Sequence, residues 1–310
     1  MPESIAALLP KLPPITLAIG ILLGLAGLWP AAWAAPSKKY SKIAIQASIV
    51  LLGFWVSLDQ VARAGVAGLA FSTGAIVLVL AVSWLLGKLL STDRDTGTLL
   101  SAGTAICGGS AIAATGSAIN AASGTIAAAT AIVFLLNAAG VYAYPAIGHA
   151  LHMTDHQFGA WCAVGVHDVA GVVGAASAFS KEALADATVI KLTRVLWIVP
   201  VALILRRISR DRHPEGGKAK SPFPWFIVLF LAACGLRALL DRTLGAASVS
   251  PWSDGAKTAA TILLSIALLL IGSAISRKTI ATLGWRPIVH GTALWLIVST
   301  AALFAARTFL

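Results

Sequence analysis

Charged side chains are scarce in this sequence. Asp, Glu, Lys and Arg make up 11% of its 310 residues, against about 25% in a typical soluble domain. Apolar residues make up 58%. A soluble protein of this length could not bury so much apolar surface, so the composition excludes the soluble classes and indicates the lipid bilayer as solvent. Because the apolar runs are continuous rather than alternating, a transmembrane β-barrel is excluded as well. We therefore predict an all-α polytopic membrane protein.

Cysteine is also scarce. The three cysteines, Cys107, Cys162 and Cys234, lie in apolar segments, and no pair of them has metal-ligand spacing. We expect no disulfide framework, no metal site and no cofactor. The phosphate-binding pattern Gly-x-x-x-x-Gly-Lys-Ser/Thr is absent too, which argues against ATP-driven transport by this chain alone.

Negative charge is the rarer sign: 12 Asp and Glu stand against 23 Lys and Arg, a net charge of +11. The basic residues mostly flank apolar runs, which is typical of topology signals and lipid headgroup contacts rather than of nucleic-acid binding. The longest basic loop, 206–222, is expected to be cytoplasmic. With alternate loops on opposite sides of a bacterial inner membrane, the N- and C-termini are then periplasmic.

The apolar runs predict about ten membrane-crossing segments, because a spanning helix needs about 20 apolar residues. The short basic run around Lys38, Lys39 and Lys42 is expected to be a loop. Three histidines form a polar loop, His149, His152 and His156, and their spacing could place them on one helical face. A loop cluster without a Cys or carboxylate shell is more typical of solvated side chains than of a zinc site. The segments are Leu12–Ser37, Ile43–Leu58, Ala64–Gly87, Leu99–Ile119, Thr125–Ile147, Phe158–Phe179, Ala187–Leu205, Phe223–Leu236, Thr258–Ser276 and Pro287–Ala306.

The run from Thr96 to Thr154 contains no charged residue, yet its centre is built of Gly, Ser, Thr and Ala. Gly108 and Gly109 each weaken a helix by about 1 kcal/mol relative to Ala and let the backbone leave helical geometry. In lipid, a broken backbone is tolerated only where it faces protein or a wet cavity. We predict a discontinuous helix over 99–119 beside a binding site. The alternative is that the small residues allow close helix packing.

A second discontinuous helix is predicted over 158–179, where His167 and Asp168 are adjacent within an apolar segment. Ionisable residues within the membrane are costly and usually functional. The alternative is a helix that begins later and is capped by this pair at the surface. Asn137 lies in the middle of the preceding segment. It either bonds the broken backbone next door or stabilises helix packing.

Lys191 and Arg194 lie within the first half of the segment 187–205. They are three residues apart and so share a helical face. Their side chains either extend along lipid to the headgroups or face the protein interior, where they would offset Asp168 or a bound anion.

Three motifs resemble the bacterial YeiH family, whose members are named for sulfate export: Ser101–Ala114, Gly165–Asp168 and Val189–Val195. The resemblance runs over most of the chain. Gly171 stands where that family usually has Gln. The resemblance implies inverted repeats with two crossing discontinuous helices, a core that holds the site, and a second part that supports a homodimer.

The leading hypothesis is a secondary transporter for a small anion, sulfate or sulfonate-like, in which a half-helix directs its N–H groups at the substrate. His167 and Asp168 would carry a coupling proton, with sodium as the alternative coupling ion. The candidate substrate-binding residues are Thr104, Cys107, Gly108, Gly109, Ser110, Asn137, Lys191 and Arg194.

Three other functions are weighed against this one. In a cation–proton antiporter, Asp168 would bind the cation. In a membrane enzyme, Cys107 would be the nucleophile, but no His or carboxylate follows at a diagnostic spacing, so we expect no enzyme. A channel lacks support because no ring-forming filter motif is present.

Overall fold

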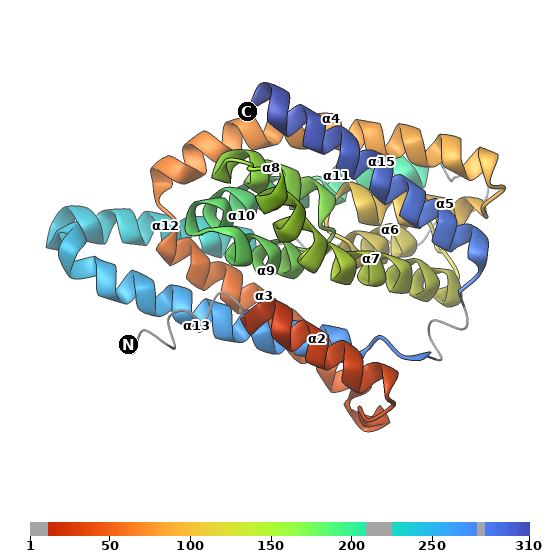
Figure 1. Ribbon diagram of the computed structural model, residues 1–310, viewed down its shortest axis with the longest axis horizontal. Helices are drawn as coiled ribbons and strands as arrows, with labels where there is room; N and C mark the ends of the chain where they lie inside the picture. Colours follow the sequence, from red (N-terminus) through yellow and green to blue (C-terminus); the bar gives the residue numbers. More distant parts are fainter. Residues whose placement is uncertain (1–11, 209–224, 278–282) are drawn as a thin grey trace.

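The computed structural model describes residues 12–208, 225–277 and 283–310, and all of its regular structure is helical (Figure 1). The prediction of an all-α chain is confirmed for these residues. The basic loop predicted at 206–222 lies mostly outside the described residues; Arg206 and Arg207 form the last turn of α11. The helices are α2 (Leu12–Leu25), the short 3₁₀ helix η2 (Ala31–Trp33), α3 (Ala34–Trp55), α4 (Leu58–Leu89), α5 (Arg94–Ala105), α6 (Gly109–Ala118), α7 (Ser123–Ala150), α8 (Asp155–Gly165), α9 (Val169–Phe179), α10 (Lys181–Val195), α11 (Ile198–Ile208), α12 (Trp225–Leu244), α13 (Ala246–Ser273) and α15 (Trp285–Phe309).

Four helical stretches in the described residues are long and apolar enough to cross a membrane. A fifth results if Lys181–Val195 and Pro200–Ile208, which meet at 43°, form one bent span. The chain is thus a multi-pass α-helical membrane protein. The four stretches are Gly68–Leu89, Gly124–Ala150, Ala246–Ser273 and Trp285–Phe309.

The predicted count of about ten segments is not reproduced. Several apolar runs are divided into helices of 10 to 12 residues, among them α5, α6, α8 and α9. At about 1.5 Å rise per residue such a helix covers roughly half of the 30 Å hydrocarbon layer. The helix order gives no support to inverted repeats either, because only α7 separates the two broken pairs.

Three helix ends differ from the prediction, two of them at charged residues. The first expected segment ends early, at Leu25, in a turn where Gly27 has a positive φ of 72°. The expected basic loop at Lys38 to Lys42 is instead part of α3. Similarly, α13 begins at Ala246 and includes Asp254 and Lys257. Long basic side chains do not stop a helix, so charge alone placed these ends wrongly.

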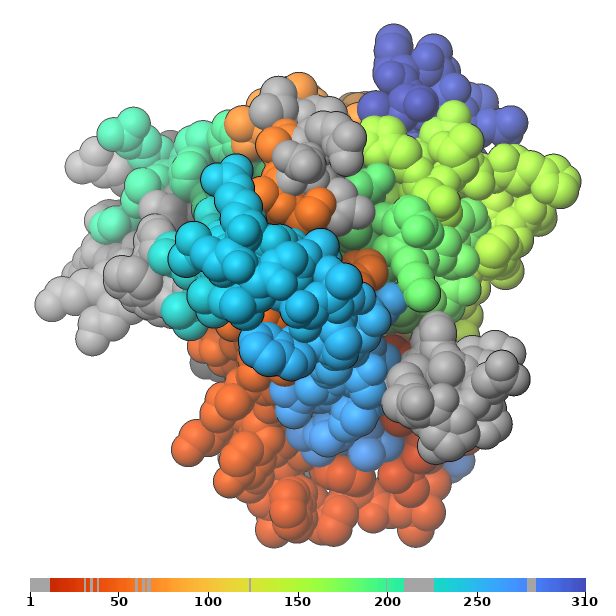
Figure 2. Space-filling view, turned by 90° about the vertical axis from the view of Figure 1, so that its left-hand side faces the viewer, coloured from red at the N-terminus to blue at the C-terminus, as the bar shows by residue number. Residues whose placement is uncertain are grey.

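The helices form two packed groups (Figure 1). Helices α2, α3, α12 and α13 pack on one another, and α4, α7, α10 and α15 pack around the short helices α5, α6, α8 and α9. Figure 2 shows the α12–α13 end (cyan to blue) between α3 (orange) and the α8–α10 region (green). A Cβ added at Gly272 would approach the Leu17 carbonyl oxygen to 2.7 Å, so the α2–α13 contact requires glycine at this position.

A polar joint ties α3 to α12 and α13. Arg237 of α12 donates to the Trp55 carbonyl at the end of α3, and Lys257 of α13 lies 4.2 Å from the centre of the Trp55 ring. The carbonyls of a helix C-terminus have no partners within the helix, and cations satisfy them well. This joint holds the first helix group together beside the core.

Candidate functional site: two crossed helix breaks

The first break separates α5 from α6 at residues 106–108. Asp93 caps α5 by accepting a hydrogen bond from the Thr96 amide at 2.9 Å. The helix closes where the Gly108 amide donates to the Gly103 carbonyl at 2.9 Å. Gly108 has φ +65° and ψ −127°, a conformation that side chains strongly disfavour. The chain then resumes helical geometry at Gly109, so the expected interruption is present.

The second break separates α8 from α9 at residues 166–168. The ring of Tyr144 packs so closely on Gly165 that any Cβ there would overlap it, and the Trp295 indole donates to the Gly165 carbonyl at 2.8 Å. Asp168 begins α9 as its N-cap, accepting from the Gly171 amide. Because α8 already starts at Asp155, His167 and Asp168 lie between two helices and do not cap a surface helix. Both side chains are buried.

The two breaks lie against each other. A Cβ built on Gly108 would be 3.5 Å from the Cβ of Asp168. On the α5 side, the Thr104 hydroxyl lies 3.3 Å from Nε2 of His167. Glycine at position 108 therefore serves both the turn and the close approach of the second break.

Two buried cations hold the C-terminal ends of α5 and α8. Lys191 Nζ donates to the carbonyls of Ala163 (3.2 Å) and Val166 (2.9 Å). Arg194 donates to Ala163 O at 3.2 Å, and through Nε to Ala105 O at 3.1 Å. These carbonyls are the ones that a helix end leaves unpaired, and the helix dipole makes this end negative.

Neither cation extends to the headgroups, because both side chains are 0% exposed. Within the described part of the chain, neither forms an ion pair with a carboxylate. Of the two alternatives for Lys191 and Arg194, the structure shows the one in which they face the protein interior. Backbone carbonyls accept their hydrogen bonds, so they add positive charge around the two breaks without presenting their atoms to the surface.

Asn137 of α7 forms a two-way contact with the second break. Its Nδ2 donates to Asp168 Oδ2 at 2.8 Å, and its Oδ1 accepts from the Asp168 amide at 3.0 Å. Of the two interpretations of this buried amide, the observed one is a bond to the broken backbone. A Cβ at Gly171 would come within 2.5 Å of Asn137 Oδ1. Glycine at 171 thus makes room for the Asn137 side chain.

The start of α6 is the more open part of the crossing. No side chain caps this helix, and its first intrahelical bond runs from the Ile112 amide to the Gly108 carbonyl at 3.1 Å. The amides of Gly109 and Ser110 therefore precede the hydrogen-bonded ladder. Ser110 is exposed, and its hydroxyl lies 2.8 Å from Sγ of the buried Cys107. A helix start of this kind is electropositive.

Comparison with known proteins decides the family. A family model described as "Conserved hypothetical protein 698" matches residues 3–291. A UPF0324 membrane protein of Geobacter sulfurreducens is 39% identical over 94% of this chain and 89% of its own length. Those of Vibrio parahaemolyticus (39%, 94% and 91%) and Bacteroides thetaiotaomicron (37%, 94% and 85%) are similar. No solved structure matches.

The chain belongs to the UPF0324 (YeiH) membrane protein family. The resemblance seen in the sequence motifs is thereby confirmed over nearly the whole chain. Membership in UPF0324 agrees with the apolar helices in placing the chain in a membrane.

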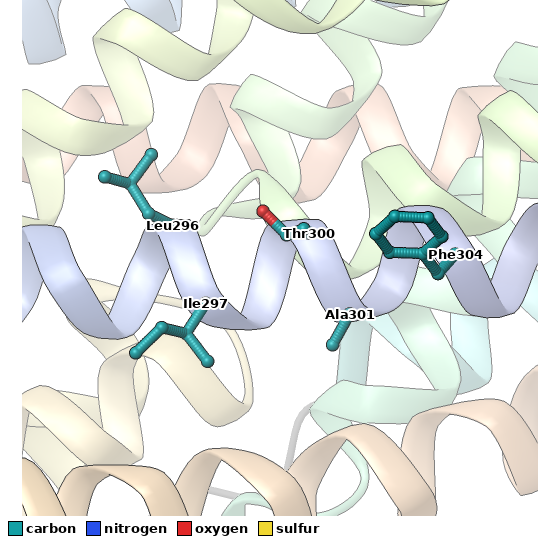
Figure 3. A pocket seen from close by; sticks show the side chains of 5 residues that line it. All are labelled: Leu296, Ile297, Thr300, Ala301 and Phe304. Atoms are coloured by element: carbon teal, nitrogen blue, oxygen red, sulfur yellow. The ribbon is translucent and has the colours of Figure 1, made fainter.

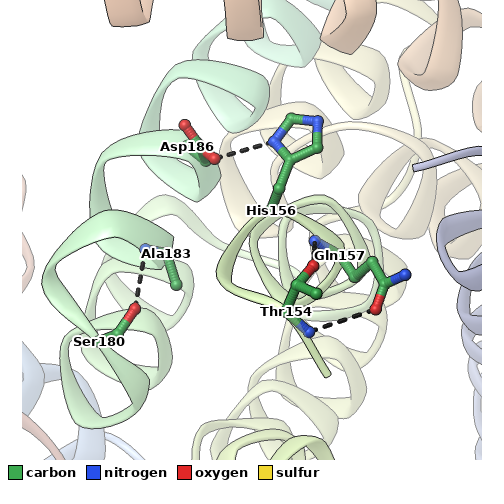
Figure 4. Close-up of polar contacts among 6 residues, drawn as sticks. All are labelled: Thr154, His156, Gln157, Ser180, Ala183 and Asp186. Atoms are coloured by element: carbon green, nitrogen blue, oxygen red, sulfur yellow. Dashed lines mark hydrogen bonds and ion pairs between the residues drawn. The ribbon is translucent and has the colours of Figure 1, made fainter. Parts of the chain in front are cut away.

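The three histidines of the predicted polar loop do not share a helical face. His149 lies in the last turn of α7 and stacks on Phe179, and His152 lies in the following turn with a positive φ of 48°. His156 belongs to α8, and its Nδ1 lies 2.9 Å from Asp186 of α10 (Figure 4). Figure 4 also shows the capping pairs that start these helices, Thr154 with Gln157 and Ser180 with the Ala183 amide.

A shallow depression on α15 lies on an apolar face of that helix (Figure 3). Its large side chains are exposed, with Phe304 at 67% and Leu296 at 52%. Thr300 adds the one hydroxyl in the set, and no charged group lines the depression. Such a surface suits contact with lipid chains and offers nothing to orient a polar ligand.

Sequence reasoning missed two groups of packed residues. Tyr144, which is buried, and Trp295, which is half-buried, fix the end of α8. His290 is fully buried between the hydroxyls of Ser83 (2.9 Å) and Thr92 (3.2 Å). These partners lie about 200 residues from His290 in the sequence, so no local pattern could have indicated the contact.

Proposed function

We propose that this UPF0324 protein is a secondary transporter that moves a small anion, sulfate or sulfonate-like, across the bacterial inner membrane. The proposal rests on the charged side chains that are buried where the two helix breaks meet. Lys191 and Arg194 are both buried there without a carboxylate partner in the described residues, against the single carboxylate of Asp168. Buried charge of one sign calls for a counter-charge, and a mobile anion can supply it.

The open start of α6 is the proposed contact surface for the anion. The amides of Gly109 and Ser110, together with the Ser110 hydroxyl, supply donors at the electropositive end of the helix. Gly108 brings this end against the second break, and Cys107 orients the Ser110 hydroxyl. In this arrangement the positive charges of Lys191 and Arg194 attract the anion electrostatically, without a direct hydrogen bond to it.

A coupling proton is assigned to His167 in preference to Asp168. Both carboxylate oxygens of Asp168 accept hydrogen bonds, from the Gly171 amide and from Asn137, so this group is committed to capping α9. Nδ1 of His167 has no partner among the described residues. The same geometry argues against the alternative of a cation–proton antiporter, since the carboxylate that would have to bind the cation already accepts hydrogen bonds on both oxygens and lies in a core that holds two buried cations.

The proposal includes a homodimer and periplasmic termini. The homodimer follows from the family resemblance, with the group α2, α3, α12 and α13 as the supporting part. The orientation places the strongly basic segment 206–222 in the cytoplasm, as the positive-inside rule favours.

Reconstitution tests the function and the coupling together. In liposomes holding a pH-sensitive dye, a sulfate gradient should drive proton movement with the wild-type protein. His167→Ala should abolish that movement, and Asp168→Asn should reduce it by weakening the α9 cap. A sodium gradient serves as the second arm. Proton movement with sodium but not with sulfate would support the cation antiporter and contradict the anion proposal.

A further inference from the structure

The Thr104–His167 contact leaves one hydrogen-bond donor unused. Thr104 is 3% exposed and His167 is 1% exposed, and their side chains meet through Oγ1 and Nε2 at 3.3 Å. The hydroxyl carries one hydrogen and a neutral imidazole carries one more on nitrogen. One contact can use only one of these two hydrogens.

Either arrangement of hydrogens leaves a donor over. If the Thr104 hydroxyl donates to Nε2, the imidazole hydrogen sits on Nδ1, which has no partner among the described residues. If Nε2–H donates to Thr104, the hydrogen of the Thr104 hydroxyl has no acceptor instead. This hydroxyl makes no other hydrogen bond among the described residues. A protonated imidazole adds a further hydrogen. Burying an unpaired donor is costly, so this pair calls for an acceptor.

The charges around the pair select the kind of acceptor. Arg194 donates to the Thr104 carbonyl at 3.2 Å, directly behind the Thr104 side chain, and Lys191 donates to the Val166 carbonyl next to His167. Both cations are fully buried. An acceptor atom with a negative charge is favoured in this field over a neutral one.

We infer that Thr104 and His167 form a subsite that binds an acceptor oxygen of a small, fully ionised oxyanion. The inference rests on the proposed function for its class of ligand, and it gives His167 a direct role as a donor to the ligand. Because both side chains are sealed from solvent, an anion reaches them when the break at 106–108 and the break at 166–168 move apart. The open start of α6, with the exposed Ser110, is the adjoining entrance.

The test measures anion binding without transport. The thermal-unfolding midpoint of the purified full chain in detergent is followed against sulfate at constant ionic strength, with sodium chloride as the balancing salt. The wild-type midpoint should rise with sulfate. Thr104→Val should weaken the apparent affinity about tenfold or more, because one charge-assisted hydrogen bond is lost, and Thr104→Ser should restore it.

A matched control is Thr188→Val. Thr188 is an equally buried threonine whose hydroxyl bonds its own helix, at Leu184 O and 2.6 Å. Its sulfate response should equal that of the wild type. As a measurement on the wild-type fold, ¹⁵N-histidine spectra should show the His167 ring nitrogens shifting on sulfate titration, with the signal assigned from His167→Phe.

The outcomes separate this inference from the proposed function. Sulfate binding that depends on Thr104, in a protein that moves no sulfate in liposomes, would support the subsite and contradict the transporter. If the wild type transports sulfate and Thr104→Val binds sulfate with unchanged affinity, the subsite is overturned and the transporter proposal stands. A wild-type midpoint and ring spectra that do not respond to sulfate would also overturn the subsite.

Discussion

Asn137 shows how one buried amide can hold a helix break in place. Its two polar ends meet the amide and the carboxylate of Asp168, so the residue that begins α9 is fixed from α7. The sequence indicated that Asn137 is a polar group within an apolar segment and left two roles open, because its partner lies 31 residues away. Gly171 was noted only as a difference from the family. Its role as space for Asn137 depends on packing that a sequence does not display.

A double-mutant cycle tests this arrangement. Gly171→Ala should lower the thermal midpoint, because the new methyl group would lie 2.5 Å from Asn137 Oδ1. In an Asn137→Ala background the same change should be neutral or stabilising, since the space is then free and Ala favours a helix over Gly by about 1 kcal/mol. The two changes should therefore be strongly non-additive. Additive shifts in the midpoint would contradict a contact between positions 137 and 171.

At the scale of the elements, the ends of α5 and α8 depend on cations contributed by a third helix, α10. Lys191 and Arg194 on α10 satisfy carbonyls of α5 and α8 that a continuous helix would have paired internally. Gly108 and Gly109 indicated where the first backbone break could occur, because the conformational freedom of glycine is a local property. The sequence could not show that Arg194 reaches both helices, since Ala105 and Ala163 are brought together only by the fold.

The cost of losing this link is the second prediction. Arg194→Met should lower the free energy of unfolding by roughly 3 kcal/mol or more, because it leaves several buried carbonyls without donors. Arg207→Met is the matched control, since Arg207 is exposed in the last turn of α11. Urea titration in mild detergent, followed by tryptophan fluorescence, measures both. Equal midpoints for the two variants would show that Arg194 does not hold the breaks.

At the scale of the whole molecule, apolar composition predicted the class correctly but not the number of crossings. Counting apolar runs assumes that each run is one helix, whereas 99–119 and 158–179 are each two short helices with a buried turn. The start of α13 was placed 12 residues too late because Asp254 and Lys257 were taken as loop residues. What remains is a core of short helices whose breaks lie against each other, beside a group formed by α2, α3, α12 and α13.

The break itself offers the variant for the most direct test. Gly108→Ala should disturb the packing of the two breaks, because residue 108 has φ +65°. A residue with a side chain is strained in this conformation, at a cost of about 1–3 kcal/mol. Gly124→Ala is the control: a Cβ at this position in the first turn of α7 would meet nothing within 4 Å. Both variants should be compared with the wild type after size-exclusion chromatography shows that they are folded.

The measurement is sulfate counterflow in liposomes, with unlabelled sulfate inside and radiolabelled sulfate outside. The account predicts a transient, saturable accumulation of label with the wild type and with Gly124→Ala, and a loss of at least tenfold in initial rate with Gly108→Ala, an effect of about 1.4 kcal/mol or more. Wild-type liposomes that take up no more label than protein-free ones, or a folded Gly108→Ala variant that transports at the wild-type rate, would contradict the claim that the crossed breaks carry the anion.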